Sequence, residues 1–315
     1  QPGPSNPDDD LQFMSDGIIQ LDYNGQRTLK IIKFRGSGFQ SGFHTFTIGD
    51  GGIHVIPSLV PPTKSVRTVE GRISSGVPEF DSLVYGGLPR GTTTIISGPT
   101  GVGKTTAAAL FVTEAVSRGN PAVIYLFEES LDTFLARCRS INIPVRELIE
   151  GESLRVRYIE PSTTTTGQFM GHIQDDIEDD IEVVMIDGIP GYRNMVGVSP
   201  DLSDLQTITK SLKRRGITVL LTDETSSITG EFRAMDSEQS HLADNIIFMR
   251  YLEVSGELRR AIGVLKMRSS GFERTLREFE ITQYGVSVGE PLTRLRGILR
   301  GIPEEIDHGV PPEEP

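Results

Sequence analysis

The feature that most constrains this chain is a glycine-rich stretch, residues 98–106, that fits the P-loop spacing G-x-x-x-x-G-K-[ST]. It consists of Gly98, Pro99, Thr100, Gly101, Val102, Gly103, Lys104, Thr105 and Thr106. Glycines let successive backbone N–H groups turn towards an anion, and the following helix presents its positive N-terminal end to the same phosphates. We therefore predict that this stretch binds nucleotide phosphates, with Lys104 on the β- and γ-phosphates and Thr105 on Mg²⁺.

The flanking sequence supplies the context that a P-loop requires, a strand before it and a helix after it. Residues 92–97 are β-branched or apolar except for a final serine, which indicates a buried strand. Residues 106–117 are rich in Ala and contain Leu, Val and Phe, which is typical of a helix packed on a sheet. A glycine turn that precedes a lysine by chance is therefore a poor explanation of the motif.

Composition limits the classes of partner and compartment. The chain has 315 residues and carries 31 Lys and Arg against 43 Asp and Glu, a net charge of −12. Because sequence-independent nucleic-acid binding needs a basic surface, nucleic acid is an unlikely partner. The sequence contains no apolar run of ~18 residues, so we expect no membrane span. The one cysteine, Cys138, is expected in the core. A single cysteine cannot form an internal disulfide and we see no basic-then-apolar leader, so we expect a reducing, cytoplasmic location.

Strand-like and helical stretches alternate after the P-loop. Apolar runs at 122–127, 183–187 and 219–222 lack polar alternation, which predicts parallel strands covered on both faces. Short alternating runs at 17–21, 29–35, 46–48 and 53–55, and the segment 245–288, instead predict antiparallel strands and hairpins. We therefore predict an α/β P-loop NTPase fold: a mostly parallel twisted sheet, helices on both faces and a C-terminal antiparallel β-hairpin extension.

The two ends of the chain share a partial repeat. Residues in the segments 33–53 and 266–286 match at one offset of 233 residues, including Lys33 with Lys266 and Arg35 with Arg268. Because residues 1–58 contain no P-loop, the simplest interpretation is that only the tail of a first repeat precedes a complete second unit. The expected domains are a disordered or cut end (1–13), the β-hairpin tail of a preceding domain (14–58), a linker (59–68), a complete ATPase domain (69–303) and a flexible tail (304–315).

Carboxylates follow two of the predicted parallel strands. Asp187 ends the apolar run 183–187, which is the Walker B arrangement, and should emerge beside Mg²⁺ because ligands sit at the carboxyl ends of such strands. Glu128 and Glu129 end the run 122–127 and should surface at the same edge. A carboxylate there can orient or deprotonate the attacking water, and neighbouring residues on an extended chain point to opposite sides. At most one of the pair should therefore face the water.

These motifs together with two later patterns resemble the KaiC family of RecA-like ATPases. The later patterns are Gly256-Glu257-Leu258-Arg259-Arg260-Ala261-Ile262-x-Val264-x-Lys266-Met267-Arg268 and Arg277-Glu278-Phe279-x-Ile281. The resemblance covers about residues 68–303 as a whole domain, the second of two in tandem, and 14–58 as the tail of the first. It implies a RecA-like fold that binds ATP with Mg²⁺, in a homo-oligomeric, hexameric ring with nucleotide at the subunit interfaces. It also implies slow hydrolysis that serves as a regulatory switch for an unknown protein partner.

The resemblance also assigns residues by position. It implies that Lys266 and Arg268 reach the γ-phosphate in a neighbouring subunit. The clock proteins of the family phosphorylate adjacent Ser and Thr; Ser240 falls on the serine here, but His241 replaces the threonine. Ser240 is thus a candidate phosphosite, and a two-site phosphorylation cycle is in doubt.

Two further residue assignments and two alternative functions remain open. We interpret the acidic run 175–180 as a solvated surface, and Thr222 as a residue that could sense the γ-phosphate. The alternatives to a KaiC-like switch are a RecA/RadA-like DNA-handling ATPase and a nucleotide-independent interaction scaffold. DNA-stimulated turnover would favour the former alternative, and failure to bind ATP would favour the latter.

Overall fold

The computed structural model describes residues 13–23, 26–58, 69–178, 180–196, 202–225, 241–298 and 304–305. The expectations for residues 1–12, for the linker 59–68, for most of the segment 304–315 and for Ser240 fall on residues outside these ranges.

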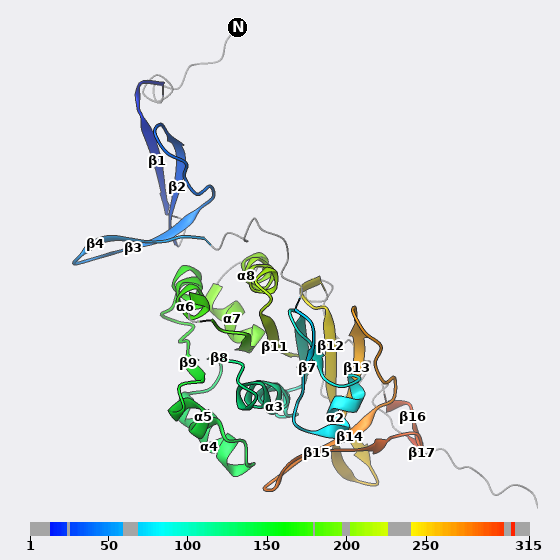
Figure 1. The fold of residues 1–315 in the computed structure, drawn as a ribbon. Coiled ribbons are helices and arrows are strands. Elements are labelled where there is room, and N and C mark those ends of the chain that lie inside the picture. The colour runs from blue at the N-terminus through cyan, green and yellow to red at the C-terminus, as the bar shows by residue number, and fades with distance from the viewer. Residues whose placement is uncertain are drawn as a thin grey trace, which may run out of the picture.

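The described residues form a nine-stranded sheet in the order β15-β14-β13-β12-β7-β11-β10-β8-β9 (Figure 1). Six strands run parallel: β7 (Thr93–Gly98), β8 (Ala122–Leu126), β9 (Leu154–Tyr158), β10 (Val183–Asp187), β11 (Thr218–Glu224) and β12 (Asn245–Val254). The antiparallel extension is β13 (Glu257–Met267), β14 (Arg277–Thr282) and β15 (Gly285–Pro291). The predicted fold class is confirmed.

Helices cover both faces of the sheet (Figure 1). On one face lie α2 (Pro78–Leu83), α3 (Lys104–Ser117), α4 (Leu131–Ser140) and α5 (Val145–Glu150). On the other lie α6 (Thr166–Glu178), α7 (Ile189–Val196) and α8 (Ser203–Arg214). Because successive strand residues point to opposite faces, Ile96 packs in the first core and Ile95 in the second. Cys138 is buried in the first core as predicted. No helix in the described part of the chain is long and apolar enough to cross a membrane.

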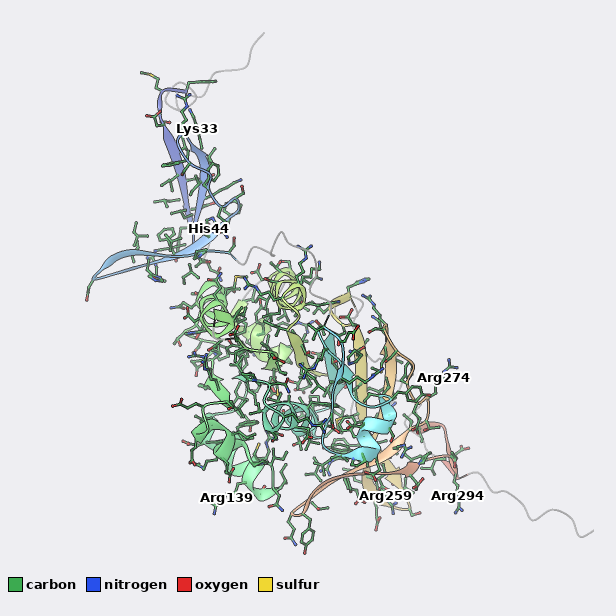
Figure 2. All side chains as sticks on the ribbon, in the orientation of Figure 1. Lys33, His44, Arg139, Arg259, Arg274 and Arg294 are labelled. Carbon is green, nitrogen blue, oxygen red and sulfur yellow. The ribbon has the colours of Figure 1, made fainter. Side chains whose placement is uncertain are left out.

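Near the N-terminus a separate four-stranded antiparallel sheet lies against α6 (Figure 1). It consists of β1 (Gly17–Tyr23), β2 (Arg27–Phe34), β3 (His44–Gly49) and β4 (Gly52–Ile56). His44, at the start of β3 (Figure 2), is buried; its Nδ1 accepts the Ser58 N–H at 3.0 Å. Gly167 allows α6 to approach, since a Cβ there would lie 2.3 Å from Cβ of Thr45. The strands lie where the alternating pattern predicts them.

Short strand pairs complete the described structure. The pair β5 (Arg72–Ile73) and β6 (Leu88–Pro89) precedes the P-loop strand. Near the C-terminus, β16 (Leu295–Arg296) pairs with β17 (Glu304–Glu305). The first two residues of the segment 304–315, for which a flexible tail is expected, thus pair with β16.

The acidic run 175–180 is not uniformly a solvated surface. Asp176 is 1% exposed and accepts hydrogen bonds from Tyr125 Oη (2.6 Å), Arg157 Nε (2.8 Å) and Arg155 Nη1 (3.0 Å). Burial alone would raise its pKa, but these donors hold the pKa of Asp176 below its ordinary value. Asp176 therefore ties α6 to β8 and β9.

Candidate nucleotide-binding site

The P-loop connects the end of β7 to the start of α3, as its motif requires. Gly101 and Gly103 have φ of 75° and 110°, values that glycine adopts without steric cost. Gly98 is needed for a different reason: a Cβ there would lie 2.7 Å from the Met249 carbonyl oxygen of the neighbouring strand β12. The loop backbone is therefore held in a shape that larger residues would disturb.

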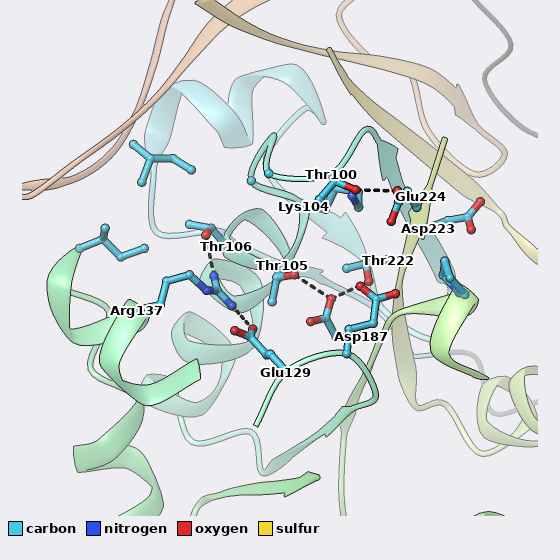
Figure 3. A pocket seen from close by; sticks show the side chains of 16 residues that line it. Thr100, Lys104, Thr105, Thr106, Glu129, Arg137, Asp187, Thr222, Asp223 and Glu224 are labelled. Carbon is cyan, nitrogen blue, oxygen red and sulfur yellow. Dashed lines mark hydrogen bonds and ion pairs between the residues drawn. The ribbon is translucent and has the colours of Figure 1, made fainter. Parts of the chain in front are cut away.

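The P-loop forms one wall of a pocket of about 360 Å³ (Figure 3). Its lining contains Thr100, Gly101, Gly103, Lys104, Thr105, Thr106, Glu128, Glu129, Arg137, Ile141, Asp187, Pro190, Thr222, Asp223, Glu224 and Ile281. Lys104 Nζ donates to the Pro99 carbonyl oxygen at 2.9 Å. Burial lowers the pKa of Lys104, and nearby carboxylates, Glu224 first and then Glu128, oppose that change.

Asp187 lies at the end of β10 and is 4% exposed. Its Oδ1 accepts hydrogen bonds from Thr105 Oγ1 at 2.9 Å and from Thr222 Oγ1 at 2.6 Å (Figure 3). Burial raises the pKa of this carboxyl group, while the two hydroxyl donors oppose the rise. Thr222, which we considered as a γ-phosphate sensor, therefore holds Asp187 in this structure.

The oxygens of Thr105 and Asp187 fit a Mg²⁺ site that phosphates complete. Among the described residues, no group of three or more His, Cys, Asp or Glu side chains could hold a metal ion by itself. Mg²⁺ is commonly held by one or two carboxylates together with substrate phosphates and water, so two protein oxygens beside the P-loop suffice. Five carboxylate side chains but only one lysine and one arginine line the pocket, which favours a bound cation.

The Glu128 carboxyl group lies beside Gly188, the residue after Asp187, at the same edge of the sheet. Its carboxyl group accepts the backbone N–H of Gly191 in α7. The surrounding protein removes part of its water shell, which, together with the charge of Asp187, raises the pKa of Glu128, and Lys104 opposes the rise. Gly188 leaves room for this carboxyl group, because a Cβ there would lie 2.6 Å from Glu128 Oε1.

Glu129 forms an ion pair with Arg137 of α4 (Figure 3). The side chains of Glu129 and Arg137 are 20% and 31% exposed. Arg137 Nη1 also donates to Thr106 Oγ1 at 3.0 Å. Adjacent glutamates thus face different partners, as the extended backbone before them predicts.

Lys266 and Arg268 lie far from this pocket within the same chain. Met267, between them, pairs with Asn245 of β12, and Asn245 pairs with Thr94 near the start of β7. The P-loop, in contrast, follows the end of β7. Lys266 Nζ donates to the Ala243 carbonyl oxygen at 2.9 Å, and Arg268 lies 3.7 Å from Asp244. In this chain these two cations are at the opposite end of the sheet from Lys104. Ser240 is outside the described residues, and the neighbouring His241 is exposed.

Sequence reasoning missed three charged residues of the pocket, Arg137, Asp223 and Glu224. Arg137 lies on the helix after the glutamate pair, where its charge alone does not distinguish it from the exposed Arg139. Glu224 accepts a hydrogen bond from Thr100 Oγ1 at 2.5 Å (Figure 3). Its position after the strand run 219–222 was the one available signal, since that run ends at the same edge as Asp187.

Comparison with known proteins identifies a matching family and several relatives. A family model described as "ATPase: KaiC" matches residues 73–293. The circadian clock protein KaiC3 of Synechocystis sp. is 29% identical over 299 residues, which cover 93% of this chain and 59% of that protein. The circadian clock oscillator protein KaiC of Synechococcus elongatus is 29% identical over 301 residues, covering 94% and 58%.

The KaiC protein of Acaryochloris marina gives a similar result, 28% identity over 94% of this chain and 58% of that protein. The chain therefore spans somewhat more than half the length of these relatives. The family match covers well over half of the chain and contains the P-loop, both glutamates and Asp187. The chain belongs to the KaiC family of ATPases.

Proposed function

We propose that this chain binds Mg-ATP in the P-loop pocket and hydrolyses it. The observation that supports this proposal is the convergence of Lys104, the Thr105–Asp187 pair and Glu128 in one pocket. Lys104 binds the terminal phosphates, Thr105 and Asp187 hold Mg²⁺, and a glutamate prepares the water. When bound, Mg²⁺ neutralises charge that develops on the phosphate oxygens.

Glu128 is the better candidate for the base. Its raised pKa brings its proton affinity nearer to that of an effective general base at neutral pH, whereas Glu129 is engaged by Arg137. Glu128→Gln should therefore keep nucleotide affinity and lower turnover by about 10²- to 10⁴-fold. Glu129→Gln is the matched control and should retain much more activity.

Phosphate release from ATP tests the proposal, with magnesium omitted in a parallel sample. Lys104→Ala should lose most affinity for Mg-ATP in calorimetry, because the phosphates lose their fixed cation. Unchanged binding by Lys104→Ala would refute the assignment of this pocket. A rise in turnover on adding DNA would instead support the DNA-handling alternative, and undetectable ATP binding would support the scaffold.

We also propose a hexameric ring in which Lys266 and Arg268 act on the γ-phosphate of the adjacent subunit. Their position at the opposite end of the sheet from Lys104 supports action between subunits. A cation supplied in this way can contribute ~10³ to 10⁵ in rate. Lys266→Ala/Arg268→Ala chains and Glu128→Gln chains should each be inactive, and mixed rings should regain part of the activity. Light scattering must show rings in every sample; mixed rings that stay inactive would refute this mechanism.

The strands β1–β4 are proposed to be the C-terminal hairpins of a preceding KaiC-like unit, with Lys33 and Arg35 in the places of Lys266 and Arg268. Support comes from the repeat and from apolar side chains that this sheet exposes. Ile19, Leu21, Tyr23, Ile32, Phe34, Ile48 and Ile53 are 59, 55, 72, 45, 51, 60 and 56% exposed. Such a cluster is typical of a surface that packs on another domain. In a chain with an added upstream unit, hydrogen exchange of β1 and β2 should slow.

The output of the hydrolysis is proposed to be regulatory. Slow turnover would let the nucleotide state of the ring control binding of a protein partner. Ser240 is retained as a candidate acceptor of the γ-phosphate, without a second site at His241. Mass spectrometry after incubation with Mg-ATP tests it, and an active ring without phosphate on Ser240 would exclude autokinase activity at this position.

A further inference from the structure

Arg137 is held in the pocket by contacts on three sides. Its Nη1 donates to Thr106 Oγ1 at 3.0 Å, its Nη2 pairs with Glu129, and its guanidinium carbon lies 5.4 Å from the centre of the Phe134 ring. Thr106 is the third residue of α3 and is itself buried. The guanidinium therefore sits beside the first turn of the P-loop helix, where N–H groups and dipole attract anions.

The position of Arg137 along the pocket indicates which part of a nucleotide it would meet. In Figure 3, Lys104 and Glu224 lie on one side of Thr105, and Arg137 with Glu129 lies on the other. One helical turn beyond Arg137, Ile141 supplies an apolar lining residue, and Ile281 of β14 supplies another. Terminal phosphates belong at Lys104 and an apolar base belongs at the isoleucines, so Arg137 lies between them.

We propose that Arg137 binds the α-phosphate of the nucleotide, and that Glu129 competes with the phosphate for the same guanidinium. This inference rests on the proposed function, because it assumes that the pocket binds a nucleotide. A guanidinium presents several N–H donors in one plane, which suits a phosphate as well as a carboxylate. A bound phosphate would share or take over the Nη2 that Glu129 now occupies. Glu129 would then lower the affinity for nucleotide, because the ion pair with Arg137 must weaken when a nucleotide enters the pocket.

Binding of ADP in EDTA tests this contact without hydrolysis and without the metal site. Arg137→Gln should weaken ADP binding about tenfold, the low end for a charged hydrogen bond because the guanidinium is partly open to water. Arg139→Gln is the matched control: it removes the same charge from the exposed face of α4 (Figure 2), and it should bind ADP like the parent chain. Calorimetry measures both, after circular dichroism has shown that each variant is folded.

The competition between Glu129 and the phosphate provides a second, independent test. Glu129→Gln should strengthen ADP binding about threefold to tenfold, because the neutral amide releases the guanidinium. The gain should vanish in Arg137→Gln/Glu129→Gln. ADP affinity in Arg137→Gln equal to that of the parent, or a Glu129→Gln variant that binds more weakly, would overturn the inference. Failure of the proposed function looks different, since the parent chain itself would then bind no ADP.

Discussion

Gly188 provides a sharp test of the hydrolytic site because it controls the position of Glu128. A Cβ added at Gly188 would lie 2.6 Å from Glu128 Oε1 and 3.1 Å from its Cδ. The carboxyl group must retreat by about 0.5–1 Å to reach an ordinary van der Waals separation. The obstacle is the far end of a flexible side chain, so Gly188→Ala should fold with little loss of stability.

The expected result is a loss of turnover with nucleotide binding intact. A displacement of about 1 Å of a catalytic group can cost ~10²-fold in rate, so we expect Gly188→Ala to lower turnover about 10- to 100-fold. Steady-state phosphate release gives the rate, and calorimetry gives the affinity for ADP. Gly171→Ala is the control: its Cβ would meet only Ile56 at 3.5 Å, an ordinary contact, and turnover should not change.

A double-mutant cycle separates this explanation from other effects at Gly188, whose added Cβ would also lie 3.3 Å from Thr222 Oγ1. If the substitution acts through Glu128, then Gly188→Ala should cause no further loss in a Glu128→Gln background. Losses that multiply would show that Gly188 acts through Asp187 and Thr222. Parental turnover in the single variant would refute the assignment of Glu128 as the base.

Three further predictions concern pH, stability and the N-terminal sheet. Since a protonated carboxyl group cannot accept a proton, and the pKa of Glu128 is raised, turnover should fall on acidification at a higher pH than an ordinary glutamate gives; a pH–rate profile checks this. Asp176→Asn should lower the free energy of unfolding by about 2–3 kcal/mol in urea titrations. Because the pKa of Asp176 is lowered on folding, its stabilisation is present above the unfolded-state pKa and is lost as pH falls through the folded one. Gly167→Val should detach β3 from α6, since its Cβ would overlap Thr45, and should speed proteolysis of β1–β4 while ADP binding is retained.

The parts of the site that were predictable carry their signal in short, contiguous segments. The P-loop motif includes its own flanking strand and helix, and β10 has the bounds 183–187 that its apolar run predicts. Parallel strands end at one edge of a sheet, so Asp187 and the glutamates could be placed together before any coordinates were known. Local pattern and a single topological rule were sufficient for these residues.

The residues that sequence reasoning missed depend on contacts between distant elements. Asp176 belongs to an acidic run, but the arginines that neutralise it come from β9, and no spacing along the chain indicates that pairing. Arg137 is similar: α4 must pack in one rotation for Arg137 to face Glu129 while Arg139 faces solvent. Whether a charged residue on a helix faces an ion-pair partner or solvent is decided only by how the helix packs on the sheet.

The strand pair β12–β13 connects the two halves of the proposed mechanism. The Met249 carbonyl of β12 lies so close to Gly98 of the P-loop that a Cβ there would be 2.7 Å from its oxygen, and the partner of Met249 in β13 is Ile262. Lys266 lies about 13 Å further along the same extended strand, at the other end of the sheet. Because β12 and β13 are paired along their length, a displacement of β12 along its axis at Met249 would either move Lys266 or break the β12–β13 ladder. In the proposed ring, this strand pair would therefore join the P-loop of one pocket to the cation offered to the next.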